Sequence, residues 1–445
     1  MIKKVKIPVT VLTLLVGLFC GSQCISAATI TVGNDPSICP VVNFTTIQSA
    51  VNAAAAGDTV NVCPGTYTEQ VTIEKNLTLR GIQVGSNKKI TVRPNTVAPN
   101  DGTIGMTSGI NRERSAIILV RRAAMTTVNP TVTIQNIIVD GGPAGNAYNG
   151  CAPEFYGIFY RNAGGSIIQN SVKNIRLSGN LFGCQTGLAI VAFADSGSAA
   201  GYNLFIQENV VDNFQKNGIT VYGSNSPDPL IGAFIFRNTI NGAGPSAQIG
   251  QNGIQLTDGI TANSVVNFNT VSNMIYAPTT PSSTNATGIL LFDITTGLDV
   301  QGNNVNRTDN AIGAYGVSNT QFRFNDLSNS TKYEGLYLAN DGSIPSNGNT
   351  LNSNRVFHTV TTGIAVLGDN NSLTLNRVND ADIGIASNGN NTVSGSVINN
   401  VRLTQSIVGP TTNAVQMEGL NRGKAERSAT KILKLRVPSF EKIER

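Results

Sequence analysis

Two short motifs alternate along this sequence of 445 residues, and their repetition restricts the fold more than any other feature. The first is an asparagine followed two positions later by an apolar residue, and it begins at Asn180, Asn209, Asn238, Asn269, Asn303, Asn325, Asn354 and Asn376. The second is a glycine followed by Ile or Leu, at Gly157, Gly187, Gly218, Gly253, Gly288, Gly335, Gly363 and Gly384, with Ala311 in the one slot that lacks a glycine. A unit of about 20 to 35 residues that fits neither helical nor heptad spacing is typical of a solenoid.

We interpret the motif residues as structural. Side chains alternate along a strand, so the asparagine and the apolar residue that follows it point to the same side, the interior. Successive inward asparagines can then hydrogen-bond from one coil to the next, which satisfies their buried amides. Glycine allows the bend before the following strand. Only 13% of residues are charged, which also suits stacked short strands better than a disordered chain.

The N-terminal residues have the pattern of a secretory signal peptide. Three lysines precede an apolar stretch that is too short to span a bilayer, and Ser26-Ala27-Ala28 offers small residues for cleavage. We therefore expect an exported chain without a transmembrane span after processing, with a retained membrane anchor as the alternative. The chain divides into a signal peptide (1–28), an N-terminal cap and first coil (29–81), a parallel β-helix (82–408) and a C-terminal cap or basic tail (409–445).

The net charge of +5 is concentrated at the two ends of the chain. Residues 413–445 alone hold eight basic and four acidic side chains, and three lysines lie in the signal segment. The body between them is slightly negative, which disfavours binding to a polyanion. Nucleic acid is therefore not expected as a partner, and we expect a monomer.

Four cysteines remain after the signal segment, at positions 39, 63, 151 and 184. An even number in an exported chain predicts disulfides. Cys39 with Cys63 would hold the N-terminal cap, whereas Cys151 and Cys184 are about one coil apart and could lie on neighbouring turns. Four buried free thiols are the alternative, and the spacings match no zinc motif.

Residues 44–81 resemble the start of a known superfamily. The stretch Phe44-Thr45-Thr46-Ile47-Gln48-Ser49-Ala50-Val51 is followed by Gly57-Asp58-Thr59-Val60, Pro64-Gly65-Thr66-Tyr67-Thr68-Glu69 and Leu77-Thr78-Leu79-Arg80-Gly81. This pattern is similar to that of the pectin lyase-like proteins. The resemblance implies an all-β fold, a right-handed parallel β-helix whose open end is covered by a short N-terminal capping α-helix. It implies no particular activity, because enzymes and non-enzymes of the superfamily share the pattern.

Equivalent positions in successive coils should lie about 4.8 Å apart, so the repeat predicts which distant residues are neighbours. Counting five residues from each motif glycine places Asp258 and Asp293 at one position of adjacent coils. Two close carboxylates could act as a catalytic pair or bind a divalent cation such as calcium. The preceding row contains Tyr222, Phe292 and Tyr315, which could stack on sugar rings. The alternative is that each aspartate only closes a turn after its strand.

A second row places the single histidine, His358, near Arg355 and Asp380. Such a group could bind an anionic sugar and transfer protons. A ladder of ion pairs on a solvent-exposed face is the alternative, and we favour it.

Two long segments, 242–250 and 276–286, should protrude from neighbouring coils and form the walls of a groove. No catalytic motif of the polygalacturonases, pectinesterases or pectate lyases can be placed on this sequence. Two functions therefore remain open: an exported lyase or glycoside hydrolase that binds or processes polysaccharide in the groove, or a non-catalytic surface, envelope or adhesin-type module that binds glycans.

Overall fold

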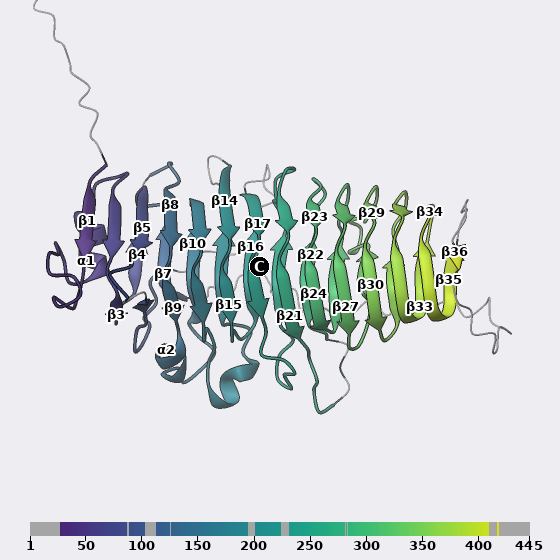
Figure 1. The fold of residues 1–445 in the computed structure, drawn as a ribbon, viewed down its shortest axis with the longest axis horizontal. Coiled ribbons are helices and arrows are strands. Elements are labelled where there is room, and N and C mark those ends of the chain that lie inside the picture. The colour runs from purple at the N-terminus through teal and green to yellow at the C-terminus, as the bar shows by residue number, and fades with distance from the viewer. Residues whose placement is uncertain are drawn as a thin grey trace, which may run out of the picture.

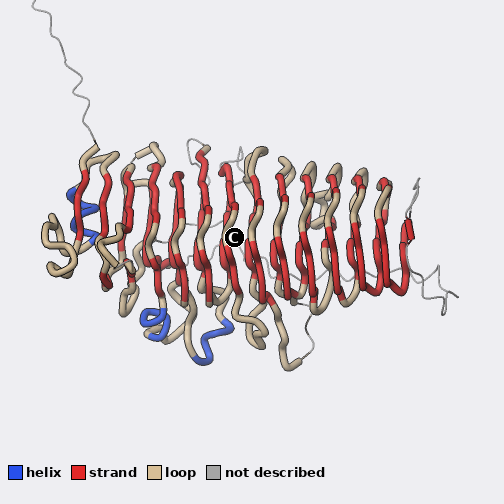
Figure 2. The backbone as a smooth tube through the Cα atoms, in the orientation of Figure 1, coloured by secondary structure: helices blue, strands red, loops and turns tan. Residues whose placement is uncertain are grey.

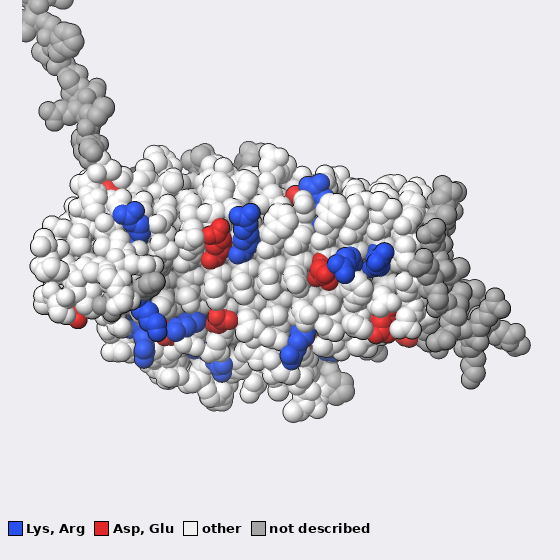
Figure 3. All heavy atoms as spheres, viewed as in Figure 1, with Lys and Arg blue, Asp and Glu red and all other residues white. Residues whose placement is uncertain are grey.

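The computed structural model describes residues 27–86, 89–102, 113–124, 126–194, 201–223, 231–280, 282, 284–408 and 416–417, with side chains up to residue 401. The chain winds into an elongated coil in which each turn lies beside the previous one (Figures 1 and 2). Every strand pairing between coils is parallel, as a right-handed parallel β-helix requires. Few Lys, Arg, Asp and Glu side chains interrupt the surface that Figure 3 shows.

The strands form three ladders, each of which contributes one face of the coil. Ladder A is a separate sheet that consists of β1 (Thr29–Val32), β2 (Thr59–Val62), β5 (Leu77–Gly81), β8 (Thr131–Gln135), β11 (Gly164–Ile168), β14 (Tyr202–Gln207), β17 (Ile231–Phe236), β20 (Val265–Asn267), β23 (Asp299–Gln301), β26 (Gln321–Arg323), β29 (Thr350–Asn352), β32 (Ser372–Thr374) and β34 (Thr392–Ser394).

Ladders B and C join into one larger sheet, because β33 and β35 run through both. Ladder B consists of β3 (Gly65–Tyr67), β6 (Ile90–Val92), β9 (Ile138–Asp140), β12 (Ser171–Lys173), β15 (Val210–Asp212), β18 (Thr239–Asn241), β21 (Thr270–Met274), β24 (Asn304–Thr308), β27 (Asp326–Ser330), β30 (Arg355–Thr359), β33 (Arg377–Asn388), β35 (Val397–Val408) and β36 (Gln416–Met417). Ladder C consists of β4 (Val71–Ile73), β7 (Arg114–Arg121), β10 (Glu154–Arg161), β13 (Leu188–Phe193), β16 (Asn217–Tyr222), β19 (Asn252–Thr257), β22 (Thr287–Phe292), β25 (Asn310–Tyr315), β28 (Leu336–Ala339), β31 (Thr362–Val366) and the second halves of β33 and β35.

Helix α1 (Ile47–Ala53) covers the N-terminal end of the coil, as residues 44–81 predict. Thr46 caps the helix by accepting a hydrogen bond from the Ser49 N–H, and the Glu69 carboxylate accepts bonds from the N–H groups of Ile47 and Gln48. Ile47 and Val51 are buried under it. The short helices α2 (Gly142–Asn146) and η1 (Gly179–Gly183, a 3-10 helix) lie in loops instead.

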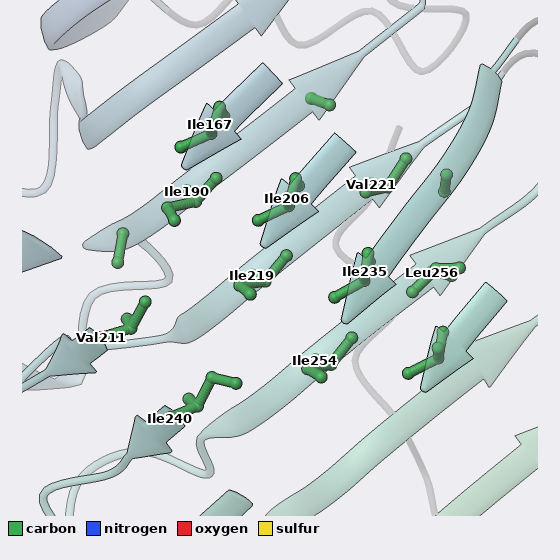
Figure 4. Packing of buried hydrophobic residues seen from close by; sticks show 14 of the residues in the cluster. Ile167, Ile190, Ile206, Val211, Ile219, Val221, Ile235, Ile240, Ile254 and Leu256 are labelled. Atoms are coloured by element: carbon green, nitrogen blue, oxygen red, sulfur yellow. The ribbon is translucent and has the colours of Figure 1, made fainter. Parts of the chain in front are cut away.

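The interior is filled by rows of Ile, Val and Leu from all three ladders, and a strand of ladder C such as β16 contributes two of them, Ile219 and Val221. Figure 4 shows these rows side by side, with Ile206 and Ile235 from ladder A, Ile219 from ladder C, and Val211 and Ile240 from ladder B. All five are fully buried. Because strands of adjacent coils are in register, each side chain lies beside its equivalent in the next coil, and the core is continuous along the axis.

The predicted asparagine ladder is present. Asn209 donates from its backbone N–H and from Nδ2 to Oδ1 of Asn238, at 3.0 and 2.9 Å, and Asn238 bonds in the same way to Asn269. The same bonding continues through Asn303, Asn325, Asn354 and Asn376. One assignment was wrong: Asn180 is exposed in η1, and Asn170 begins the ladder, because the segment after β12 leaves the coil before it returns.

Both predicted disulfides are formed, Cys39–Cys63 and Cys151–Cys184. The first lies beside the N-terminal cap, and the second joins the loop after α2 to the end of η1. No helix in the described part of the chain is long and apolar enough to cross a membrane. The expected signal peptide and basic tail lie outside the described residues, apart from the two-residue strand β36.

Candidate functional site

The outward side chains of ladder C line the most elaborate polar surface among the described residues. Strands β16, β19 and β22 pair in register, so Asn217, Asn252 and Thr287 form one row across the strands. Thr220, Gln255 and Leu290 form a second row. The intervening Ile and Leu residues point into the core, which leaves this face free for polar and aromatic groups.

A pocket of about 160 Å³ opens on this face between the two long segments that the sequence predicts as walls. Gln248, Ile249 and Gly250 line it from segment 242–250, and Tyr276, Thr284 and Asn285 line it from segment 276–286. The strands and the residues next to them contribute Gln185, Lys216, Asn252, Gln255, Leu290 and Phe292. The groove predicted from loop lengths is therefore present, but its lining differs from the predicted one.

Hydrogen bonds between coils hold the pocket floor in place. Asn217 Nδ2 donates to Gln255 Oε1 at 2.8 Å, and Asn252 Nδ2 donates to Asn217 Oδ1 at 3.2 Å. The Lys216 ammonium donates to the Gly250 carbonyl at 3.2 Å, which fixes one wall segment to the strand face. The floor is thus preorganised.

Two carboxamides of the pocket have buried atoms without a hydrogen-bond partner in the described part of the chain. These atoms are Oε1 of Gln185 and both Oδ1 and Nδ2 of Asn285. Asn285 is only 4% exposed, so its unbonded amide is costly in the free protein. A ligand with both donors and acceptors would remove that cost.

Asp258 and Asp293 occupy equivalent positions of adjacent coils, as the repeat predicts. Each directly follows a paired strand residue, Thr257 or Phe292, and each is buried. Both also have a left-handed backbone, with φ of 52°, so each closes a turn after its strand. The described residues contain no group of three or more His, Cys, Asp or Glu that could bind a metal ion. Calcium at these two aspartates would need further ligands.

The three aromatic residues of the predicted row do not form one platform. Phe292 lines the pocket and stacks on Tyr315 at 5.1 Å between ring centroids, with an interplanar angle of 24°. Thr257 separates Phe292 from Tyr222, which instead packs edge-on against Phe193. Burial raises the pKa of both tyrosine hydroxyls, so both are neutral at physiological pH.

His358, Arg355 and Asp380 lie on the solvent-exposed part of ladder B. His358 Nδ1 is 2.5 Å from Asp380 Oδ2, while Arg355 Nη1 is 3.6 Å from Asp326 Oδ2. The side chain of His358 is 58% exposed. These residues precede ladder C strands, whereas Asp258 and Asp293 follow them, so the two groups lie at opposite edges of that face. Their geometry is that of an ion-pair ladder.

Glu334 was not identified from the sequence, although it lies on the same face. It is buried, and its N–H donates to Oδ1 of Asn310 at 3.2 Å, while its Oε1 accepts a bond from Thr361 Oγ1 at 3.3 Å. Burial raises the pKa of this carboxyl to about 7. The only available sequence signal was a charged residue immediately before Gly335 of the repeat.

A second group that sequence reasoning missed lies nearer the N-terminal end of this face. Arg114 is buried between Glu154, with Nε to Oε2 at 3.3 Å, and Asp101, with Nη1 to Oδ2 at 3.8 Å. Arg161 also pairs with Asp101, at 2.8 Å. Opposite charges are close together throughout this group, and it connects residue 101 to strands β7 and β10, which indicates a structural role.

Comparison with solved structures returns parallel β-helix proteins. XylC in complex with xylose gives a TM-score of 0.49 and 10% identity over 86% of each chain. A family 28 exopolygalacturonase from Yersinia enterocolitica gives 0.46 and 11%, over 86% of this chain and 78% of that one. The DFA-IIIase of Arthrobacter chlorophenolicus A6 gives 0.38 and 15%, over 83% and 85%.

No protein-family model and no curated protein matches the sequence. The fold assignment rests on the strand pairings and the capping helix, and at this level the resemblance seen in residues 44–81 is confirmed. The chain folds as a right-handed parallel β-helix.

Proposed function

We propose that this chain is an exported protein that binds a polysaccharide in the pocket on ladder C. The observation that carries the proposal is the buried carboxamide of Asn285, which has no partner in the described chain. Four further carboxamides, those of Gln185, Gln248, Asn252 and Gln255, line the same pocket. Carboxamides both donate and accept hydrogen bonds, as hydroxyl groups do. The lining therefore matches the alternating donors and acceptors of a sugar.

The apolar part of the lining supports the same ligand class. Leu290 and Phe292 from β22 and Tyr276 from the wall segment offer apolar surface beside the amides. A sugar ring has C–H groups on its faces and hydroxyls at its edge, so it can use both kinds of surface. A volume of about 160 Å³ is smaller than that of a drug-sized pocket, so the pocket would hold one unit of a longer chain.

Whether the chain also cleaves the bound polysaccharide is a separate question, and Asp258 and Asp293 are the candidate catalytic residues. In this proposal the two carboxylates, at the edge that follows Phe292, act on the chain held in the pocket as a lyase or glycoside hydrolase pair, with calcium as a possible ligand. The non-catalytic surface or adhesin-type module is the second candidate, and the turn-closing conformation of both aspartates favours it.

The test compares the processed chain with Asn285→Ala and Gln255→Ala on a panel of neutral and acidic polysaccharides. Removal of the unbonded Asn285 amide should leave the stability unchanged or raise it slightly, because an unsatisfied buried group disappears. The same change should weaken binding about tenfold to a hundredfold. Asn203→Ala, which removes an exposed amide from the ladder A strand β14, is the control and should bind normally.

Unsaturated and reducing chain ends are scored in the same samples, with calcium and with chelator. Turnover that is lost in Asp258→Asn or Asp293→Asn would establish the enzyme. Binding without turnover supports the non-catalytic module. Equal affinity of the wild type and Asn285→Ala would contradict the pocket assignment. Export and the monomeric state are proposals too, tested by cell fractionation and by sedimentation.

A further inference from the structure

A row of left-handed residues forms the corner between ladders A and B, one residue per coil. The row consists of Asn136, Gln169, Glu208, Arg237, Phe268, Gly302, Phe324, Ser353, Leu375 and Gly395, with φ between 55° and 65°. The backbone bonds stay in register here: Phe268 N–H donates to the Gln301 carbonyl at 2.9 Å, and Gly302 N–H donates to the Arg323 carbonyl at 3.0 Å. The fold therefore imposes this conformation on whichever residue occupies the corner.

Phe268, Phe324 and Leu375 are unfavourable choices for such a position. Glycine and asparagine adopt a left-handed backbone at low cost, whereas a bulky residue there is a true outlier. These three side chains are also 52%, 57% and 61% exposed, so the monomer gains little by burying them. A smaller residue would lower both the conformational strain of the left-handed backbone and the cost of exposing apolar surface to water. The three side chains, called the corner ridge below, therefore point to a contact outside the monomer.

The corner ridge is regular and stiff. Its members alternate with the small residues Gly302, Ser353 and Gly395, so large side chains recur every second coil, about 10 Å apart along the axis. A Cβ atom at Gly302 would lie only 2.6 Å from Cδ1 of Phe268, so the ring lies directly over that glycine. Leu375 lies over Gly395 in the same way, at 2.9 Å.

The surroundings of the corner ridge hold few charges, and most of them form ion pairs: Arg237 with Glu208 at 3.9 Å, Arg323 with Asp299 at 2.9 Å, and Arg355 with Asp326 at 3.6 Å. Arg377, in register with Arg355, adds one further exposed cation. Figure 3 shows this face, and charged side chains are sparse on it. A polyanion, an anionic membrane or a strongly charged protein finds no complementary patch here.

Carboxamides flank the ridge on its ladder A side. Asn267, Gln301 and Asn352 precede Phe268, Gly302 and Ser353 in the same register, and all three are half-buried. Arg323 occupies the position between Gln301 and Asn352, where its charge is paired with Asp299. Rings at fixed intervals beside neutral donors and acceptors suit an uncharged chain of sugar rings better than they suit a second protein, which would need a broad apolar patch.

We propose that the corner ridge binds an uncharged polysaccharide that lies along the axis of the coil. This surface is separate from the ladder C pocket, since ladder A and ladder C form different faces. The ridge would hold an extended or insoluble glycan, while the pocket would take a single unit of a chain.

The test uses the full processed chain and the double variant Phe268→Asn/Phe324→Asn. Asparagine already occupies this row at Asn136 with φ of 58°, so the double variant should fold and melt at the same or a higher temperature. Its sedimentation with insoluble cellulose and its affinity for a soluble uncharged glucan should fall about tenfold or more relative to the wild type. Ser353→Asn changes the same row between the large residues and should bind normally.

A further variant and further ligands distinguish the ridge proposal from its alternatives. Asn285→Ala should keep its binding to cellulose, because the ladder C pocket is a different site, so failure of one proposal does not imply failure of the other. Three results would overturn the ridge proposal: a wild type that binds no uncharged glycan, a double variant that binds as tightly as the wild type, or a double variant that loses only polygalacturonate or vesicle binding. Concentration-dependent self-association that only the wild type shows would identify a second copy as the occupant and also overturn it.

Discussion

Glu334 gives the sharpest prediction about stability, because it places an ionisable carboxyl in the sheet face with no cation as its partner in the described contacts. Burial raises the pKa of this group from 4.5 to about 7. The hydrogen bonds from its own N–H and from Thr361 favour the charged form and oppose burial only in part. At pH 8 the folded chain must therefore hold a buried charge that the unfolded chain leaves in water.

The magnitude and sign follow from linkage between protonation and folding. Raising the pKa of the Glu334 carboxyl from 4.5 to about 7 corresponds to about 3 kcal/mol. The folded pKa is above the unfolded one, so the contribution to stability is fully present below about pH 4.5 and is lost as the pH rises through about 7. Glu334→Gln keeps the shape and an oxygen that can accept from Thr361, and it removes the charge. We expect the variant to match the wild type near pH 4.5 and to be more stable by up to about 3 kcal/mol at pH 8.

Urea unfolding of both proteins from pH 4.5 to 8.5 measures the difference, with midpoints compared because long coils need not unfold in two states. Because every other titrating group is the same in both proteins, its contribution cancels when the unfolding midpoints of variant and wild type are subtracted at each pH. A difference that is constant across this pH range would show that the carboxyl titrates normally and would refute the reasoning. A variant that is less stable at pH 8 would show that the charged form is favoured by contacts other than those described here.

Two further substitutions test the repeat itself. Asn269→Ala should destabilise the chain by about 3 kcal/mol or more, because it removes the amide that donates to the Ile235 carbonyl and the oxygen that accepts from the backbone N–H and from Nδ2 of Asn238. Urea unfolding measures this loss. Gly253→Ala should lower the free energy of unfolding by about 1–3 kcal/mol or more, because a Cβ atom there would lie 2.3 Å from Cγ1 of Val271. Gly150→Ala is the control: its Cβ atom would meet nothing within 4 Å, so the melting temperature should not change.

The coil could be predicted from the sequence because the repeat depends on short-range requirements that recur in every turn. An inward asparagine at the corner and a glycine before the next strand identify the turn, and Val, Ile or Leu two residues after the asparagine identifies the core. The prediction failed at Asn180, where the same motif occurs by chance in a loop and the strand preceding it had already supplied Asn170 to the ladder. A motif cannot show whether the chain has left the coil.

The pocket was predicted only in outline. Loop length indicated that segments 242–250 and 276–286 form walls, but not which side chains they turn inward. Gln185 and Lys216 come from other coils, and their distance from Asn285 depends on how each loop folds back. Glu334 was missed for a related reason: its raised pKa comes from burial, which no local sequence pattern reveals.

The residues that the sequence predicted as candidates for catalysis or ligand binding share a conformational explanation. Asp258, Asp293, His358 and Asp380 all have φ between 52° and 62°, and Asp, Asn and His are the side chains that tolerate a left-handed backbone best after glycine. A polar residue at a coil corner therefore needs no function to explain it. Asn285 has the opposite properties, since its backbone is not left-handed and its buried amide lacks a partner in the described chain. Asparagine fits a left-handed corner as well as aspartate does, so Asp258→Asn changes the charge without straining the backbone, and any loss of activity that it causes would be chemical in origin.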